Sequence, residues 1–235
     1  VDTVFVGNTY IDIDENIQSN PVEYFVLAMD RCGNTSLFDA SQQTVFLRSG
    51  DISSCEQTIA LEWTAYENWQ GGVEKYEVWY SENGATPQLA GSAAGNALSY
   101  TFENANDQTE YCFFVRAIES GIGIAAASNA VCLTTDIVQP NRLLIAKNAT
   151  YNAAGQIELS WIWNTDAELR EAAIDRAAEG AAFSAISTST PTLPLDPAVS
   201  YTDNEAAGFS GPVGYLLRTW DVCDTEMESN VVNTL

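Results

Sequence analysis

The chain contains no histidine in its 235 residues. A serine or cysteine nucleophile therefore lacks its usual general base, and a common zinc ligand is missing. The sequence also has no Cys-x-x-Cys pair and neither of the phosphate-binding patterns GxGxxG and GxxxxGKS/T. Paired carboxylates such as Asp12 with Asp14, or Glu103 with Asp107, are expected from the number of acids alone and do not indicate a glycosidase. These absences predict that the chain is not an enzyme and carries no organic cofactor.

Basic residues are also scarce, with nine lysines and arginines against 32 aspartates and glutamates, a formal net charge of −23. Such a surface repels phosphate backbones and anionic lipids, so we expect no nucleic-acid binding. No apolar run approaches the roughly 20 residues that span a bilayer, and we expect no membrane insertion. The excess of acids either attracts divalent cations or forms a solvated face, and the solvated face is the simpler interpretation.

What the sequence does contain is a succession of short alternating segments typical of β-strands. Residues 58–63 place Ile59, Leu61 and Trp63 on one face, and residues 73–80 alternate in the same way. No helical periodicity longer than a turn or two interrupts them. Strands of this length, separated by turns rich in glycine, asparagine and serine, predict an all-β fold of antiparallel β-sandwiches.

Three copies of one segment indicate an internal repeat. Each copy begins with a tyrosine and continues as an apolar strand. The copies are residues 24–30, 111–117 and 215–221. Trp63 and Trp161 match in the same way 98 positions apart, and the tyrosines of the last two copies lie 104 positions apart. A spacing of this size corresponds to one sandwich domain.

These landmarks divide the chain into three parts. Residues 1–48 are expected to be the C-terminal half of a truncated domain, because the front strands that would pair with them are missing. Residues 49–136 are expected to form a complete domain, and residues 137–235 a further one. The chain would then be a stretch of a longer tandem array.

Five cysteines in a sequence of this kind indicate an oxidising compartment, and hence a secreted or cell-surface location. A simple hairpin centred near residue 122 places Cys112 opposite Cys132, so this pair is expected to form a disulfide, with two buried free thiols as the alternative. Cys32 and Cys55 are proposed as a second pair that would staple neighbouring domains. Cys223 is then left to pair with a residue outside the chain.

Residues 167–185 depart from the repeat because eight of them are alanine. Ala172 is expected where the second domain has the core residue Tyr76, which would leave the core underpacked at a cost of a few kcal/mol. Three explanations are open. Neighbouring side chains fill the gap, or the stretch is locally helical, or these alanines stand where the natural residues are larger.

An acid-rich turn precedes the late strand of each copy. Carboxylate and amide oxygens suit calcium, and a bound calcium ion would stiffen an extracellular protein. The spacing does not match an EF-hand loop, however, and aspartate and asparagine are also ordinary turn formers. The candidate calcium ligands are Asp12, Asp14, Glu103, Asp107 and Asp203.

Two tryptophans are candidates for stacking on sugars. Trp69 and Trp79 lie where exposure is expected, and a flat aromatic face is a usual surface for carbohydrate. The alternative is structural, with Trp79 covering a domain face and Trp69 wedged against a neighbouring domain.

Several segments together resemble tandem fibronectin type III-like domains, and more narrowly those of the large gliding-motility-associated surface proteins of Bacteroidota that the type IX system exports. The likeness covers essentially the whole chain. It is carried by residues 61–66 (LEWTAY), 73–80, 111–117 (YCFFVRA), 128–132 (SNAVC) and 30–36 (DRCGNTS). The resemblance implies an extracellular spacer or filament-forming segment of a long protein.

The function expected from the sequence is therefore structural. The chain would be a disulfide-stapled rod or spacer in an adhesin, fibre or filament, with neighbouring domains of the same chain as partners and a homo-oligomer in a surface fibre as a further option. The alternative is an accessory module that binds glycan or calcium for an attached secreted enzyme or adhesin tip. Fold alone does not decide between them.

Overall fold

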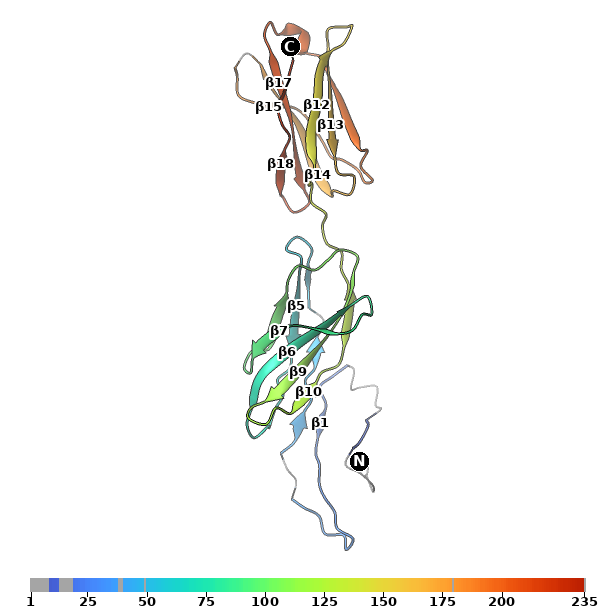
Figure 1. Cartoon of the computed structure of the whole chain (residues 1–235), viewed down its shortest axis with the longest axis vertical. Coiled ribbons are helices and arrows are strands. Elements are labelled where there is room, and N and C mark those ends of the chain that lie inside the picture. The colour runs from blue at the N-terminus through green and yellow to red at the C-terminus, as the bar shows by residue number, and fades with distance from the viewer. Residues whose placement is uncertain (1–8, 13–18, 38–39, 49, 179, 235) are drawn as a thin grey trace. The chain divides into compact units, whose positions relative to one another are not determined.

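The computed structural model describes residues 9–12, 19–37, 40–48, 50–178 and 180–234. The chain divides into two compact units, Val1–Ile137 and Val138–Leu235, and each unit contains a sandwich of two antiparallel sheets, with a further two-stranded sheet in unit 1 (Figure 1). Among the described residues the only helical element is a single 3-10 turn, Ala206–Gly208. The fold is all-β, as the sequence predicts.

The sandwich of unit 1 has β5 at the centre of one sheet and β6 with β9 at the centre of the other. The first sheet consists of β3 (Leu47–Arg48), β4 (Ile52–Ser53), β5 (Thr58–Trp63) and β8 (Ser99–Phe102). The second consists of β6 (Val73–Glu82), β7 (Gln88–Ala94), β9 (Glu110–Glu119), β10 (Ala125–Ala127) and β11 (Val131–Thr134). Strand β5 pairs with β3, β4 and β8, while the second sheet runs β10, β9, β6, β7 with β11 also on β9. This arrangement is that of a fibronectin type III-like sandwich.

The core of unit 1 lies between these two sheets. Ile59, Leu61 and Trp63 of β5 are 0 %, 0 % and 4 % exposed, so the predicted alternation faces inward. Val45 and Leu47, which precede the expected boundary at residue 49, also pack into this core. The sandwich therefore includes residues on both sides of that boundary.

The described residues between 9 and 44 form little regular structure. Strand β1 (Glu23–Tyr24) pairs with β2 (Gln42–Gln43), and Met29 forms an isolated bridge with Thr35. Large apolar side chains are open to solvent here, with Val26 at 79 % exposure. The segment therefore contrasts with the closed core beside it.

Unit 2 repeats the sheet order of unit 1. Its first sheet consists of β12 (Leu144–Tyr151), β13 (Ile157–Trp163) and β16 (Ala198–Asp203), with β13 in the centre. Its second sheet consists of β14 (Leu169–Ala178), β15 (Ser184–Ser189), β17 (Val213–Asp221), β18 (Glu226–Glu228) and β19 (Val232–Asn233). The order is β15, β14, β17, β18, with β19 also on β17. Trp161, 0 % exposed, takes the place of Trp63.

The alanine-rich stretch forms a strand and not a helix. Residues 169–178 make up β14, which pairs with β15 on one side and β17 on the other. Ala172 is 5 % exposed and belongs to the core. Trp163 and Leu195 are buried in the same core and supply volume there. The helical explanation is therefore wrong.

The strand pairing also corrects the expected match between Ala172 and Tyr76. Tyr76 and Leu169 each pair with the residue six positions after the tyrosine of the neighbouring strand, β9 or β17. Ala172 instead takes the place of Val78, because both pair with the residue four positions after that tyrosine. A register shift between Leu169 and Glu171 hides this match in the sequence.

Candidate functional site

The structure does not bring the candidate calcium ligands together. Asp14 lies outside the described residues, and Glu103 is exposed. Asp107 accepts a hydrogen bond at 2.8 Å from the backbone N–H of Ile137, 30 positions later, and so ties its turn to the end of unit 1. In the described parts of the chain, no group of three or more acidic or cysteine side chains is placed to hold a metal ion. Calcium binding stays a prediction.

Asp203 is instead the centre of a buried polar network in unit 2. Its side chain is 3 % exposed, and its Oδ2 accepts hydrogen bonds from Arg176 Nη1 and from the Tyr215 hydroxyl, both at 2.8 Å. Its Oδ1 accepts a third bond, at 3.0 Å, from the backbone N–H of Glu205. The guanidinium of Arg176 also lies 4.8 Å from the ring of Phe209. Arg176 therefore neutralises a carboxylate that water does not reach.

This network fixes the protonation state of its members. Burial on its own raises the pKa of Asp203, but the hydrogen bonds from Arg176, Tyr215 and the Glu205 backbone outweigh it and lower the pKa below its usual value. Burial and the neighbouring Asp203 raise the pKa of Tyr215 far above its usual range. Asp203 is thus ionised and Tyr215 protonated at neutral pH, which suits a fastening and not a proton-transfer site.

The acid and tyrosine recur at the same spacing in the first repeat. The Tyr24 hydroxyl donates to Asp12 Oδ2 at 2.8 Å, and both pairs are separated by 12 positions. In the sandwich of unit 1 the pair is replaced by aromatic packing, with Phe102 5.2 Å from Tyr111. The Tyr111 hydroxyl there accepts a hydrogen bond from the backbone N–H of Asn106 at 3.0 Å, which ties the corner of the sandwich.

A threonine closes each of the three repeats in the same way, a feature that the sequence analysis missed. The hydroxyl of each threonine accepts a hydrogen bond from the backbone N–H of the residue two positions before the repeat tyrosine. The threonine N–H donates in return to the carbonyl of that same residue. The pairs are Thr44 with Val22, Thr135 with Thr109 and Thr234 with Val213, at separations of 22, 26 and 21 residues. Their similar separations are the signal that would have found them.

The Ser-Asn pairs of the sequence hold the two sheets of each sandwich together at one edge. Asn129 Oδ1 accepts from the Leu47 N–H at 2.8 Å, and its Nδ2 donates to the Leu47 carbonyl at 3.0 Å. Asn230 forms the same two bonds to Ala146, at 2.9 and 3.1 Å. Each asparagine therefore connects a strand of the first sheet to the segment that ends the second.

The cysteines match the sequence analysis in part. Cys112 and Cys132 are joined by a disulfide with an S–S distance of 2.03 Å, and they face each other in the pairing of β9 with β11. Cys32 is exposed and is a free thiol, so the expected pair of Cys32 with Cys55 is wrong. Cys55 and Cys223 are both disulfide-bonded. The partner expected for Cys223, outside the chain, stays a prediction.

The two candidate sugar-stacking tryptophans are both engaged by protein side chains. Trp79 lies nearly parallel to Phe114, with ring centroids 6.1 Å apart, and the Arg116 guanidinium lies 5.8 Å from its ring. Its Nε1 donates to Glu77 Oε2 at 3.3 Å. Trp69 packs against Tyr66 at 4.0 Å. These contacts favour the structural interpretation of both residues.

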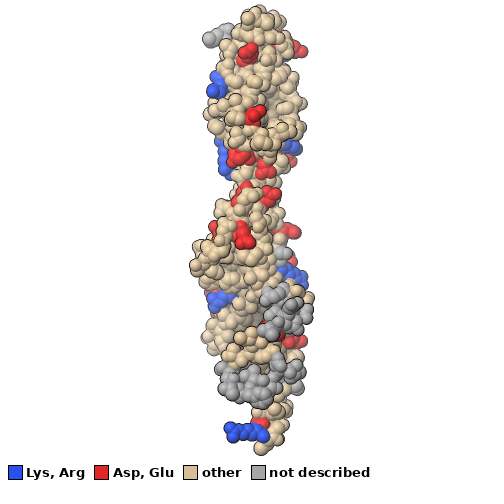
Figure 2. Space-filling model, turned by 90° about the vertical axis from the view of Figure 1, so that its right-hand side faces the viewer, with Lys and Arg blue, Asp and Glu red and all other residues tan. Residues whose placement is uncertain are grey.

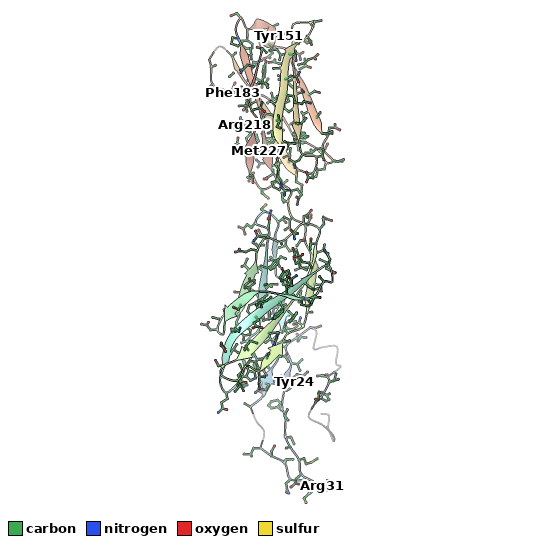
Figure 3. The ribbon with its side chains drawn as sticks, in the orientation of Figure 1. Tyr24, Arg31, Tyr151, Phe183, Arg218 and Met227 are labelled. Carbon is green, nitrogen blue, oxygen red and sulfur yellow. A yellow bond between two sulfur atoms is a disulfide. The ribbon has the colours of Figure 1, made fainter. Side chains whose placement is uncertain are left out.

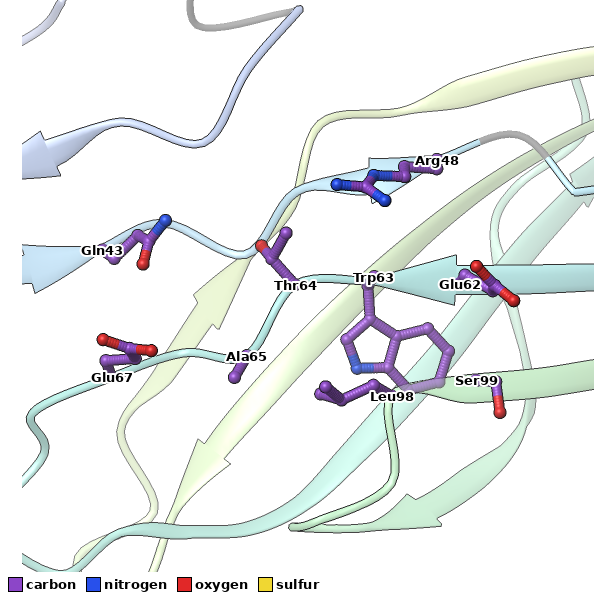
Figure 4. Close-up of a pocket in the computed structure, with 9 residues that line it drawn as sticks. All are labelled: Gln43, Arg48, Glu62, Trp63, Thr64, Ala65, Glu67, Leu98 and Ser99. Carbon is purple, nitrogen blue, oxygen red and sulfur yellow. The ribbon is translucent and has the colours of Figure 1, made fainter.

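A surface depression of about 630 Å³ in unit 1 is lined by polar and charged side chains of both signs (Figure 4). Arg48, Glu62 and Glu67 lie around it, and Trp63 lies beneath. The Trp63 Nε1 is buried without a hydrogen-bond partner, but so is the Nε1 of Trp161 in unit 2. The unpartnered indole therefore belongs to the repeated core tryptophan and does not single out a ligand site.

On the face seen in Figure 2, aspartates and glutamates are spread over both units among a majority of uncharged residues. Across the described residues, no helix has the length and apolar character needed to cross a membrane.

No family model matches the sequence, and no curated protein matches it. Three solved structures illustrate what the chain is similar to. A tetra-tandem repeat from the extending region of a large adhesion protein is 16 % identical, with TM-score 0.36, 91 % of this chain covered and 56 % of that one. A two-domain fibronectin type III segment of chicken tenascin is 12 % identical, with TM-score 0.35 and coverages of 80 % and 95 %. Pectate lyase PelI of Erwinia chrysanthemi, in complex with tetragalacturonic acid, is 15 % identical, with TM-score 0.32 and coverages of 38 % and 28 %.

The chain thus spans just over half of the adhesion-protein segment and under a third of the pectate lyase. Its fold class follows from its own strand order, in which the same two-sheet arrangement occurs in both units. The chain is a tandem of fibronectin type III-like β-sandwiches.

Proposed function

We propose that the chain is a non-enzymatic structural segment of a long extracellular or cell-surface protein, acting as a spacer in an adhesin, fibre or filament. The observation that carries this proposal is the threonine closure, which recurs in three copies of the repeat. Three of the acids that the sequence singles out, Asp12, Asp107 and Asp203, serve the same purpose, because they bond to the backbone or to a tyrosine. Tandem repetition of a fastened sandwich supports a mechanical role more than a binding role.

The proposal includes a third sandwich, to which residues 1–48 contribute the C-terminal half. Val26, at 79 % exposure, corresponds to Leu217 of unit 2, which is 1 % exposed, since each lies two positions after the repeat tyrosine. A strand face that is buried in one repeat and exposed in another needs a second β-sheet to bury it, as in the closed sandwich. Neighbouring domains of the same long chain are the partners that this proposal requires.

The finer origin rests on the sequence resemblance. We assign the segment to the type IX-exported, gliding-motility-associated surface proteins of Bacteroidota because of the YC, SN and D-x-C-G-N elements. A location on the cell surface also agrees with the disulfide between Cys112 and Cys132, which persists in oxidising compartments. Assembly with copies of itself in a surface fibre belongs to the same proposal.

Small-angle scattering combined with ligand assays tests this function. A spacer is expected to give an extended pair-distance distribution, no calcium-dependent shift in melting temperature and no signal on a glycan array. A compact particle would contradict the spacer. A calcium-dependent shift or a saturable glycan signal would instead support the accessory-module alternative.

A further inference from the structure

Cys32 and Cys223 lie at the same place in the same kind of turn. Asp30 Oδ1 accepts hydrogen bonds from the backbone N–H groups of Cys32 and Asn34, at 2.8 and 2.9 Å. Asp221 Oδ1 accepts them from Cys223 and Thr225, at 2.9 and 2.8 Å. The aspartate thus holds the second and fourth residues after it in both repeats, and the cysteine is the second.

The backbone of the two turns agrees as well. The N–H of Asp30 donates to the carbonyl of Asn34 at 2.9 Å, and that of Asp221 donates to Thr225 at 3.1 Å. The third residue has a positive φ in each case, 85° at Gly33 and 64° at Asp224. Both cysteines are therefore held in equivalent positions by their own turn, and Arg31 marks the tip of the first one in Figure 3.

The two cysteines differ in oxidation state. Cys223 is disulfide-bonded, whereas Cys32 is an exposed free thiol. A hairpin at this place in the sandwich does not require a cysteine, because the corresponding hairpin of unit 1, residues 119–125, contains none and follows Ala117 where the other two have the aspartate. The cysteine that the two turns share is thus explained by the disulfide that it can form, and Cys223 already forms one.

We propose that Cys32 is a second disulfide attachment site, which binds a cysteine of a neighbouring sandwich domain outside residues 1–235. This inference rests on the proposed function, since it requires an adjacent domain. The Cys32 thiolate attacks one sulfur of a disulfide oxidant, forms a mixed disulfide and releases one thiol of the oxidant. The partner thiolate then displaces the second oxidant thiol, so two protein thiols are oxidised as one oxidant disulfide is reduced.

The natural protein provides the direct test. Cells that make it are treated with N-ethylmaleimide to block free thiols, and the protein is digested without reduction and analysed by mass spectrometry. The expected result is a Cys32 peptide linked to a cysteine peptide of another sandwich domain. Recovery of Cys32 alkylated by N-ethylmaleimide, or linked to a cysteine within residues 1–235, would overturn the proposal.

The 235-residue chain provides a second test with glutathione disulfide as the probe. Cys32 is expected to gain one glutathione per chain, and Cys32→Ser is expected to gain none while unfolding at the same temperature as the parent. A Cys32 that does not react would contradict an attachment site at this turn. If Cys32 proves free in the natural protein while scattering still shows an extended particle, this inference fails and the spacer function stands.

Discussion

Asp203 is a buried residue of unit 2 whose negative charge contributes to the stability of that unit. Its carboxylate is 3 % exposed and paired with Arg176 at 2.8 Å. Asp203→Asn keeps the shape of the side chain but removes its charge. Arg176 then keeps only the exposed Glu205 as an acidic partner in a largely buried site. We expect the free energy of unfolding of unit 2 to fall by about 2–3 kcal/mol. Chemical denaturation followed by intrinsic fluorescence measures it.

Glu205→Gln is the matched control for this substitution. Glu205 contacts the same arginine at 3.4 Å, but its side chain is 82 % exposed. An exposed ion pair contributes roughly 0–1 kcal/mol, so the control should unfold close to the parent. Equal losses in the two variants would mean that burial of Asp203 is not what makes its pair with Arg176 important.

The lowered pKa of Asp203 also predicts how unit 2 responds to acid. Burial opposes the shift, but the hydrogen bonds from Arg176, Tyr215 and the Glu205 backbone hold the folded-state pKa below the unfolded value. The stabilisation is therefore fully present above the unfolded pKa and is lost as the pH falls through the folded pKa. Denaturation curves below about pH 4 should show a steeper loss for the parent than for Asp203→Asn. Parallel pH profiles would exclude Asp203 as the group responsible.

At the scale of strands, Asn129 and Asn230 each hold the two sheets of one sandwich together along one edge. Asn129→Ala removes both hydrogen bonds to the backbone of Leu47, a residue that is 0 % exposed. We expect a loss of about 1–2 kcal/mol and faster amide hydrogen exchange at Leu47. Asn230→Ala should act in the same direction in unit 2.

Asn148→Ala serves as the control for the bridge in unit 2. Its side chain is exposed, donates to Thr150 within the same strand and accepts from Ser160 of β13, which belongs to the same sheet, so it connects no two sheets. Its effect on unfolding is expected to stay within about 0.5 kcal/mol. An equally large loss in this variant would argue that any strand asparagine matters and that bridging does not.

The strands show how far sequence alone reaches. Alternation placed Ile59, Leu61 and Trp63 inside because one face of an antiparallel sheet is buried, and their exposures are 0 %, 0 % and 4 %. The match of Ala172 to Tyr76 failed because the connection before β14 is shorter than the one before β6, and because a register shift in β14 moves the later residues by one further position. Alternation describes faces within a strand and contains no information about such shifts.

The sequence identified the polar residues and cysteines that stabilise the sandwiches, but it did not identify the partners to which they bond. The sequence marked Asp203 as an oxygen ligand, because an aspartate in an acid-rich turn looks the same whether it faces a cation or an arginine. Arg176 is 27 residues away. The pairing of β14 with β17 places it opposite Tyr215, and Asp203 contacts both from the other sheet. For the same reason Cys32 was matched by spacing to Cys55, although spacing gives no information about distance in the fold.

At the scale of the whole molecule, the two kinds of polar bond chosen for substitution each lie within one sandwich. Asp203 with Arg176 belongs to unit 2, and Asn129 with Leu47 belongs to unit 1. Each unit also has its own hydrophobic core. A domain with its own core and its own fastenings is expected to unfold as one cooperative step. The chain as a whole should therefore not unfold in a single transition.

Calorimetry of the parent and two variants tests this independence. The parent is expected to require two transitions, with Asn129→Ala lowering only one of them and Asp203→Asn only the other, by on the order of 10 °C for the larger loss. A spacer assembled from self-sufficient sandwiches needs such independence, because each domain must stay folded when its neighbour opens. One transition that moves with either substitution would mean that the two units form a single cooperative body, which would contradict a tandem of independent sandwiches.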